Sequence, residues 1–242
     1  MLIPDVLPRD EALALRPLLQ KAIDDDIARW RGKPGCIDEW MVHNLMVRGR
    51  PFLRLLENRV LHAYLDEFLS DTCILYAYTS SSMPPGGSNY SRRIHVDCPR
   101  VIPGYVTNVG ITLALDDFTE ENGATELLPD SQWRTDMPSD EEFDRSAIRF
   151  MPKAGQAIMF NARTWHRGGV NRTGEPRHAL TINACRSFMR QRFDYARLID
   201  PDLLDHVGPL GRRFLGFNVR MPASLEEYYV PEEQRLYKGG QG

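Results

Sequence analysis

The segment IHVDCP, residues 94–99, places a histidine and an aspartate two positions apart in an apolar stretch with the composition of a β-strand. Residues i and i+2 of a strand project from the same face, so His95 and Asp97 are predicted to point together while Val96 points away. An imidazole and a carboxylate on one face can bind one metal ion. The H-x-D pattern is short and also arises by composition alone, so the interpretation depends on a further ligand.

We expect that further ligand to be His166, which follows the strand-like run AIMFN. Taken alone, His166 fits a buried structural histidine. Two histidines and one carboxylate on a triangular face, however, leave three positions open on an Fe(II) ion, as activation of O₂ requires. A hydrolytic zinc site needs fewer open positions. The hypothesis is therefore that His95, Asp97 and His166 bind Fe(II) and form the catalytic centre.

Arg177 follows His166 by eleven residues, beyond the turn NRTGEP. If that turn closes an antiparallel hairpin in which Val170 faces Arg177, the arginine lies on the same face as His166. A guanidinium that points into a sheet protein needs an anion, and it binds a carboxylate through two parallel hydrogen bonds. This predicts a dicarboxylic cosubstrate whose other end binds the metal. The alternative is an ion pair between Arg177 and a carboxylate of the protein.

The stretch YVTNVGITLALDD, residues 105–117, is a predicted strand with two different faces. Its odd positions are mostly apolar and should pack into a core, whereas its even positions are small or polar. Asn108 and Thr112 on the even face are predicted to bind a carboxylate or keto acid in a cavity. A solvated outer face fits this pattern equally well.

Together these residues resemble the phytanoyl-CoA dioxygenase family of Fe(II)/2-oxoglutarate oxygenases. The resemblance runs from about residue 40 to residue 185 and includes the segment LALDDFTEENGATELLPDS between the two halves of the triad. This chain departs from the family pattern at two positions near the expected iron: family members often carry polar side chains there, whereas this chain has Val96 and Gly168. Asp97 retains the carboxylate that related halogenases lack, which disfavours halogenation.

The resemblance implies a mainly β fold, a double-stranded β-helix of the jelly-roll, cupin-like type with iron at one mouth. It also implies 2-oxoglutarate and O₂ as cosubstrates, with Arg177 holding the distal carboxylate and the keto acid end chelating Fe(II). The expected reaction hydroxylates or otherwise oxidises a C–H bond of a small metabolite, in biosynthesis, and releases succinate and CO₂. A cupin-type metal protein that does not use 2-oxoglutarate, acting as an isomerase or ligand-binding module, is the alternative.

Hydrophobic periodicity divides the chain into three parts of one predicted domain, residues 1–242. Apolar residues at intervals of three and four predict N-terminal helices in residues 1–70. Short β-branched and aromatic runs between turn signals predict the jelly-roll core in residues 71–186, interrupted by a helix near SDEEFDRSA. Residues 187–242 are a predicted helical extension with a helix near ASLEEYYVPEEQRLY.

Substrate contacts are predicted around the segment that leads into His95. Asn89, Tyr90 and Arg93 belong to the Pro/Gly/Ser-rich loop before it and are candidate lid residues, although they also fit an ordinary surface. Tyr76 and Tyr78 in the preceding strand are candidate pocket residues or core tyrosines. The arginines after the core, Arg186, Arg190, Arg192 and Arg197, could bind an anionic substrate, but a solvated basic face is the favoured interpretation.

The composition of the chain favours a small-molecule partner over nucleic acid or a membrane. The chain has 242 residues, 42% of them hydrophobic, a net charge of -3 and a pI near 6.1, which supply no field for nucleic acid or an anionic membrane. No apolar run is long enough for a membrane span, and the N-terminus lacks a signal-peptide pattern, so a cytoplasmic protein with a small-molecule substrate is expected. The four cysteines, expected as free thiols, form no metal motif. The oligomeric state is left open.

Overall fold

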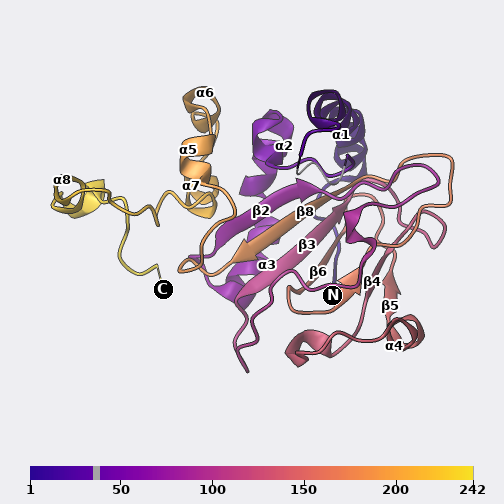
Figure 1. The fold of residues 1–242 in the computed structure, drawn as a ribbon. Helices are drawn as coiled ribbons and strands as arrows, with labels where there is room; N and C mark the ends of the chain where they lie inside the picture. The colour runs from indigo at the N-terminus through magenta and orange to yellow at the C-terminus, as the bar shows by residue number, and fades with distance from the viewer. Residues whose placement is uncertain (35–38, 242) are drawn as a thin grey trace.

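The computed structural model describes residues 1–34 and 39–241. Two antiparallel sheets form its centre: five strands in the order β1-β6-β3-β8-β2, and three strands in the order β5-β4-β7 (Figure 1). The strands are β1 Leu2–Ile3, β2 Ile74–Ser80, β3 Asn108–Ala114, β4 Thr125–Leu127, β5 Ile148–Phe150, β6 Ala157–Asn161, β7 His166–Arg167 and β8 Ala179–Cys185. The helices are α1 Arg9–Trp30, α2 Arg50–Arg54, α3 Arg59–Leu69, α4 Asp140–Ser146, α5 Tyr195–Leu198, α6 Pro201–Leu204, α7 Pro209–Phe214 and α8 Leu225–Tyr228.

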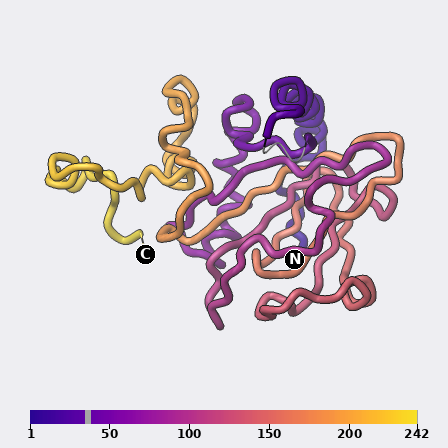
Figure 2. Tube along the Cα trace, viewed as in Figure 1, coloured from indigo at the N-terminus to yellow at the C-terminus, as the bar shows by residue number. Residues whose placement is uncertain are grey.

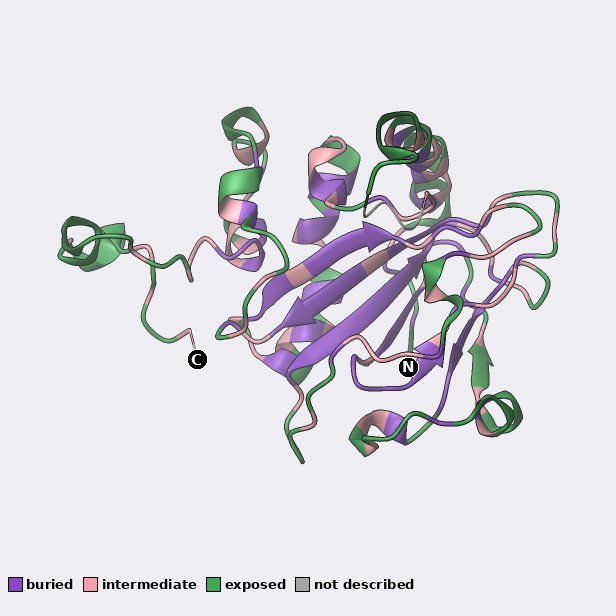
Figure 3. Cartoon of the chain, in the orientation of Figure 1, coloured by how far each residue is buried: buried purple, intermediate pink, exposed green. Residues whose placement is uncertain are grey.

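The N-terminal helices cover one face of the five-stranded sheet. In α3, buried leucines recur at three- and four-residue spacing, and the side chain of Asn58 caps the helix by accepting a hydrogen bond from the Leu61 backbone N–H at 2.9 Å. One hydrophobic cluster runs from α1 and α3 through the odd-numbered side chains of β3 to Phe214 of α7. Figure 3 shows the central strands buried. These helices therefore form a wall of the core.

The prediction of a mainly β protein was wrong, because α-helices hold more residues than strands in the described chain. Turn signals indicate how many strands a chain has but not how long they are. Here several expected strands are two or three residues long, and other contacts are isolated bridges. The observed class is a mixed helix and sheet protein with two antiparallel sheets.

The C-terminal segment contains less helix than predicted. Within residues 223–237 only the four-residue helix α8 and a 3₁₀ turn at Glu232–Gln234 form. Pro231 lies between them, and a proline cannot supply the backbone N–H that a continuous helix would need. Figure 2 traces this segment, in yellow, away from the rest of the chain.

Three local predictions have clear outcomes. The helix near SDEEFDRSA is confirmed as α4, capped by Ser139, whose side chain accepts a hydrogen bond from the Glu142 backbone N–H. Cys73, Cys98 and Cys185 are buried free thiols, while Cys36 lies outside the described residues. Among the described residues, no helix is both long and apolar enough to cross a bilayer.

Candidate active site

His95, Asp97 and His166 lie together between the two sheets. The backbones of His95 and His166 exchange two hydrogen bonds, at 3.0 and 2.9 Å, and form an isolated bridge. Asp97 Oδ1 lies 3.6 Å from His95 Nε2 and 3.8 Å from His166 Nε2. One ligand atom from each of the three residues falls within 4.8 Å of the others. The regular strand expected for residues 94–99 was wrong, but extended backbone at His95 still brings the side chains two positions apart together.

Both histidines present the same ring nitrogen to the site. His95 Nδ1 donates to the Arg93 carbonyl at 2.6 Å, and His166 Nδ1 donates to the Thr164 carbonyl at 2.9 Å. A carbonyl only accepts, so each Nδ1 carries the proton and each Nε2 keeps its lone pair for a metal. Burial and the neighbouring His166 also lower the pKa of His95 to about 4, which keeps the ring neutral at pH 7. Neutral imidazoles of one tautomer are suited to bind a cation.

Two buried asparagines hold Asp97 in place. Asn183 of β8 donates from Nδ2 to Asp97 Oδ2 at 3.4 Å, and its Oδ1 accepts a hydrogen bond from Asn108 Nδ2 at 3.2 Å. Asn108 therefore points towards Asn183 and is not part of the pocket wall, so its observed contact supports Asp97 through Asn183 and does not face the pocket. Thr112, four residues further along β3, does line the pocket.

A glycine in β3 makes room for the aromatic ring beside His166. The ring of Phe160 lies 4.7 Å from the ring of His166, centroid to centroid. A Cβ at Gly110 would come within 2.8 Å of the Phe160 ring, closer than ordinary contacts allow. Only glycine at this position of the sheet lets Phe160 pack over β3 and against His166.

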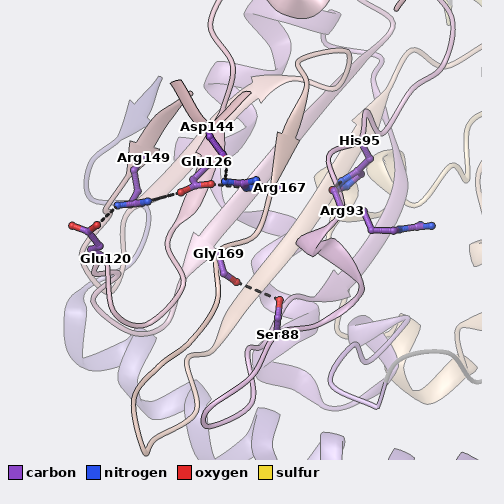
Figure 4. A network of polar contacts seen from close by, with 9 residues as sticks. All are labelled: Ser88, Arg93, His95, Glu120, Glu126, Asp144, Arg149, Arg167 and Gly169. Atoms are coloured by element: carbon purple, nitrogen blue, oxygen red, sulfur yellow. Dashed lines mark hydrogen bonds and ion pairs between the residues drawn. The ribbon is translucent and has the colours of Figure 1, made fainter. Parts of the chain in front are cut away.

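A buried carboxylate ties the strand of His166 to its neighbours (Figure 4). Glu126 of β4 accepts hydrogen bonds from Arg149 Nη2 at 2.6 Å and from Arg167 Nε at 2.6 Å. Arg149 also forms an ion pair with Glu120 at 2.7 Å, and Arg167 forms one with Asp144 at 2.6 Å. Because Arg167 follows His166 in the two-residue strand β7, this network positions a candidate metal ligand.

The three candidate ligands open into a pocket of about 330 Å³, at the small end of the range for ligand sites. Its wall includes Thr112 from β3, Thr181 and Asn183 from β8, and Thr125 from β4. The alternative of a solvated face for β3 is excluded, since every residue of that strand is buried. From the even face of β3, Thr112 lines the pocket, whereas Asn108 points towards Asn183.

Arg177 lies directly behind this pocket and is only 1% exposed. Its guanidinium donates to the carbonyls of Ser81 at 3.1 Å and Gly123 at 3.0 Å, and it lies 4.2 Å above the ring of Phe118. Ser81 and Met83 line the pocket, and Met83 pairs with the Arg177 backbone. Arg177 therefore backs the pocket wall without itself being part of it.

No ion pair joins Arg177 to a carboxylate within the described chain. The carboxylate of Asp116, which raises the pKa of Arg177, is paired with Arg16 at 2.8 Å. Burial is the larger effect and lowers the pKa of Arg177 to about 9, so the group remains charged at neutral pH. The predicted alternative of a protein ion pair is thus not what the structure shows. A buried cation held only by carbonyls and a ring can still receive an anion.

The route by which Arg177 reaches the site differs from the predicted hairpin. Residues 166 and 167 belong to the three-stranded sheet, whereas residues 179–185 belong to the five-stranded sheet. The chain crosses between sheets, and Arg177 bridges Met83 where Val170 was expected. The assumed register was wrong because the partner of each strand comes from a distant part of the chain.

The tyrosines predicted to contact the substrate lie in two different places. Tyr76 and Tyr90 line the pocket, whereas Tyr78 is fully buried in the core and donates to the Phe52 carbonyl. A β-bulge between Leu75 and Ala77 shifts the parity of β2, which is why two tyrosines two positions apart face differently. Of the two interpretations of Tyr78, the structure supports the core tyrosine and not the pocket residue.

The other two loop residues support the site from outside the pocket wall. Asn89 caps the 3₁₀ turn Tyr90–Arg92 through its Oδ1, which accepts from the Ser91 N–H at 2.8 Å. Arg93 is exposed, stacks 4.0 Å above the Tyr90 ring, and supplies the carbonyl that orients His95. Neither residue is part of the pocket wall, and a substrate contact of Asn89 or Arg93 stays a prediction.

Sequence reasoning missed several pocket residues, including Met41, Thr125, Phe160, Thr181 and Asn183. For Arg192 a solvated face was the favoured interpretation and an anionic substrate the alternative; the residue lines the pocket while remaining exposed. Thr181 and Asn183 follow the two-residue spacing of a cavity face within LTINAC, a signal that could have identified them.

Comparison with known proteins places these features in a family. A family model for phytanoyl-CoA dioxygenase (PhyH) matches residues 42–179. The uncharacterized protein Rv1501 of Mycobacterium tuberculosis is 33% identical over 207 residues, covering 83% of this chain and 76% of that protein. The dioxygenase FUM3 of Gibberella moniliformis is 26% identical, covering 55% of this chain and 44% of that protein.

Solved structures show the same fold at lower identity. EctD from S. alaskensis with bound Fe is 16% identical with a TM-score of 0.64, over 79% of this chain and 74% of that chain. The epimerase SnoN, in complex with Fe3+, alpha ketoglutarate and nogalamycin RO, is 18% identical with a TM-score of 0.57, over 76% of this chain and 78% of that chain. With its family match across 42–179, this chain belongs to the phytanoyl-CoA dioxygenase (PhyH) family.

Proposed function

We propose that this protein is an Fe(II)/2-oxoglutarate-dependent oxygenase that oxidises a C–H bond of a small molecule, with release of succinate and CO₂. The observation that carries the proposal is a His-Asp-His triad beside a pocket that is backed by a buried arginine, Arg177, which pairs with no carboxylate of residues 1–34 and 39–241. In this proposal the two antiparallel sheets are the two halves of a double-stranded β-helix, and residues 1–242 form one domain. The continuous hydrophobic cluster from α1 to α7 supports a single domain.

The donor set fits a divalent iron. His95 and His166 would bind through Nε2, because their Nδ1 atoms are already committed to carbonyls, and Asp97 would bind through Oδ1. Two imidazoles and one carboxylate suit Fe(II) with positions left open. Bound there, iron would supply a site at which a keto acid and O₂ react. The chain's own contribution is to direct Nε2 of both imidazoles towards the site through the Nδ1 hydrogen bonds and to orient Asp97 through Asn183.

Arg177 is the proposed partner for the distal carboxylate of 2-oxoglutarate. Its hydrogen bonds to the carbonyls of Ser81, Gly123 and Asn122 use three of the five N–H donors of the guanidinium, so two donors remain for a carboxylate. Thr112 lines the pocket and is a proposed second contact. In this proposal Asn108 does not contact the cosubstrate but supports Asp97 through its hydrogen bond to Asn183.

The comparisons supply further support. SnoN is described with Fe3+ and alpha ketoglutarate, EctD with bound Fe, and several curated relatives as dioxygenases. We carry these ligands to this chain as a proposal, on the strength of its own triad and arginine. Small-molecule turnover fits a pocket of about 330 Å³. A cupin-type protein that does not use 2-oxoglutarate would leave the buried charge of Arg177 without a role.

The test is anaerobic addition of Fe(II) and then 2-oxoglutarate to the protein, followed by visible absorption spectroscopy for the band of a chelated keto acid. Wild type should show the band and, after O₂ is admitted, form succinate. Asp97→Ala should lose both. Arg177→Gln should bind Fe(II) but need roughly 10- to 100-fold more 2-oxoglutarate, because a charge-assisted hydrogen bond contributes about 1.5–3 kcal/mol.

Arg212→Gln is the matched control, since Arg212 also donates to two backbone carbonyls but belongs to α7. It should behave as wild type in both measurements. Metal binding without a keto acid band in the wild type would favour the cupin alternative. Absence of metal binding would refute the assignment of the triad.

A further inference from the structure

A single arginine lines the pocket wall. Arg192 is exposed, and the described lining residues include no other arginine and no lysine. The remainder of the wall is neutral or small, with threonines at 79, 112, 125 and 181. Asp97 is the lining carboxylate, and it belongs to the triad. The wall therefore carries one positive charge that the candidate metal centre does not account for.

The position of Arg192 is built into the fold by the β-bulge in β2. The bulge lies between Leu75 and Ala77, and it leaves the Tyr76 carbonyl available to other donors. That carbonyl accepts the Arg192 backbone N–H at 3.0 Å and the Tyr195 hydroxyl at 2.9 Å. The first hydrogen bond holds the Arg192 backbone against β2, and the second ties Tyr195 to the same carbonyl. The side chain of Tyr76 also lines the pocket.

Neighbouring contacts restrain the same segment. Gln191 donates from Nε2 to the Leu75 carbonyl at 2.8 Å and to the Leu215 carbonyl at 3.2 Å. Tyr195 itself is fully buried. The backbone on both sides of Arg192 is therefore anchored, and its side chain is presented to the pocket from a fixed point.

The charge of Arg192 is not neutralised by the protein. Across residues 1–34 and 39–241, no ion pair involves Arg192. The nearest acidic residue in sequence, Asp194, pairs with Arg197 at 3.8 Å and caps α5. A guanidinium with free donors at a pocket wall is suited to bind a planar or tetrahedral anion through paired hydrogen bonds.

We propose that Arg192 binds an anionic group, a carboxylate or a phosphate monoester, on the substrate. The term substrate rests on the proposed function, whereas the anion site itself does not. Two arginines then divide the recognition of anions. Arg177, buried behind Ser81, serves the cosubstrate, and Arg192, exposed at the wall, serves the molecule that is oxidised.

The experiment is equilibrium dialysis of the anaerobic protein with Fe(II) and saturating 2-oxoglutarate against paired probes. The pairs are benzoate and benzamide, hexanoate and hexanamide, and phenyl phosphate and phenol. Saturating 2-oxoglutarate prevents the acids from occupying the cosubstrate site. The wild type should retain at least one anionic probe over its neutral counterpart, and Arg192→Gln should reduce that retention about tenfold. Retention of benzoate or hexanoate would indicate that the bound group is a carboxylate, and retention of phenyl phosphate would indicate a phosphate monoester.

Arg190→Gln is the matched control, because Arg190 is an exposed arginine two residues away that is not part of the pocket wall. It should retain the probes as wild type does. Equal retention of neutral and anionic probes, retention of none, or retention unaffected by Arg192→Gln would overturn the proposal. Loss of the 2-oxoglutarate band in Arg192→Gln would assign Arg192 to the cosubstrate and overturn it as well. Absence of the keto acid band in the wild type would contradict the proposed function, whereas the dialysis result would still decide whether Arg192 binds anions.

Discussion

Replacement of Glu126 by glutamine tests how the ion-pair network supports the candidate metal centre. The Glu126 side chain is 10% exposed and receives hydrogen bonds from two arginines, Arg149 and Arg167. A glutamine keeps the shape but turns an N–H₂ group towards one of these donors, so about one charge-assisted hydrogen bond is lost and donors face each other.

The expected loss of stability depends on which ion pairs the two arginines keep in the variant. A hydrogen bond to a charged group contributes about 1.5–3 kcal/mol, and the loss of one partner from a buried pair costs about 3–5 kcal/mol. Here Arg149 keeps Glu120 and Arg167 keeps Asp144, so the lower figure applies. We expect Glu126→Gln to lower the free energy of unfolding by about 2 kcal/mol. Because Leu127 of β4 pairs with His166, we also expect weaker Fe(II) binding.

The assay is urea unfolding of the metal-free protein, followed by Fe(II) titration at pH 7.5 under anaerobic conditions. Glu120→Gln is the matched control: it removes the other carboxylate from Arg149, but its side chain is 65% exposed, so its loss should cost less than about 1 kcal/mol. Equal destabilisation by the two variants would refute the reasoning that burial makes Glu126 the central member. Loss of stability with unchanged Fe(II) affinity would refute the coupling to His166.

Three further variants test the supports of the site. Asn183→Ala should weaken Fe(II) binding about tenfold by releasing Asp97, and an isothermal titration in which the affinity is unchanged would contradict that role. Gly110→Ala should displace the Phe160 ring from His166 and lower unfolding stability by about 1–3 kcal/mol, measured in urea; a neutral result would mean that the ring relaxes freely. Burial lowers the pKa of His178 from 6.5 to about 4, so the unfolded chain binds this proton more tightly. Stability from His178 is present above pH 6.5 and lost as the pH falls towards 4. Compared with His178→Asn, the wild type should lose about 3 kcal/mol more over that interval, and parallel pH profiles would exclude the effect.

Local chemistry in the sequence was sufficient to identify the triad candidates. Two-residue spacing places His95 and Asp97 on one side of any extended backbone, whether or not the segment joins a regular strand. The same period separates the odd positions of β3, which pack into the core, from the even position Thr112, which lines the pocket. Apolar intervals of three and four residues likewise indicated the N-terminal helices. All of these signals act over a few residues, so they do not depend on the partners of each segment.

Tertiary structure alone decided which side chains reach the pocket. The bulge in β2 separates Tyr76 from Tyr78, and the crossing between sheets sets the position of Arg177 where a hairpin was expected. Asn183 and Arg192 acquire their places from contacts with Asp97 and the Tyr76 carbonyl, both about a hundred residues away in the chain. Register, bulges and long-range hydrogen bonds are settled by the packing of distant segments, and no local pattern encodes them. The sequence by itself thus determined the chemistry that is available, whereas the fold determined where that chemistry faces.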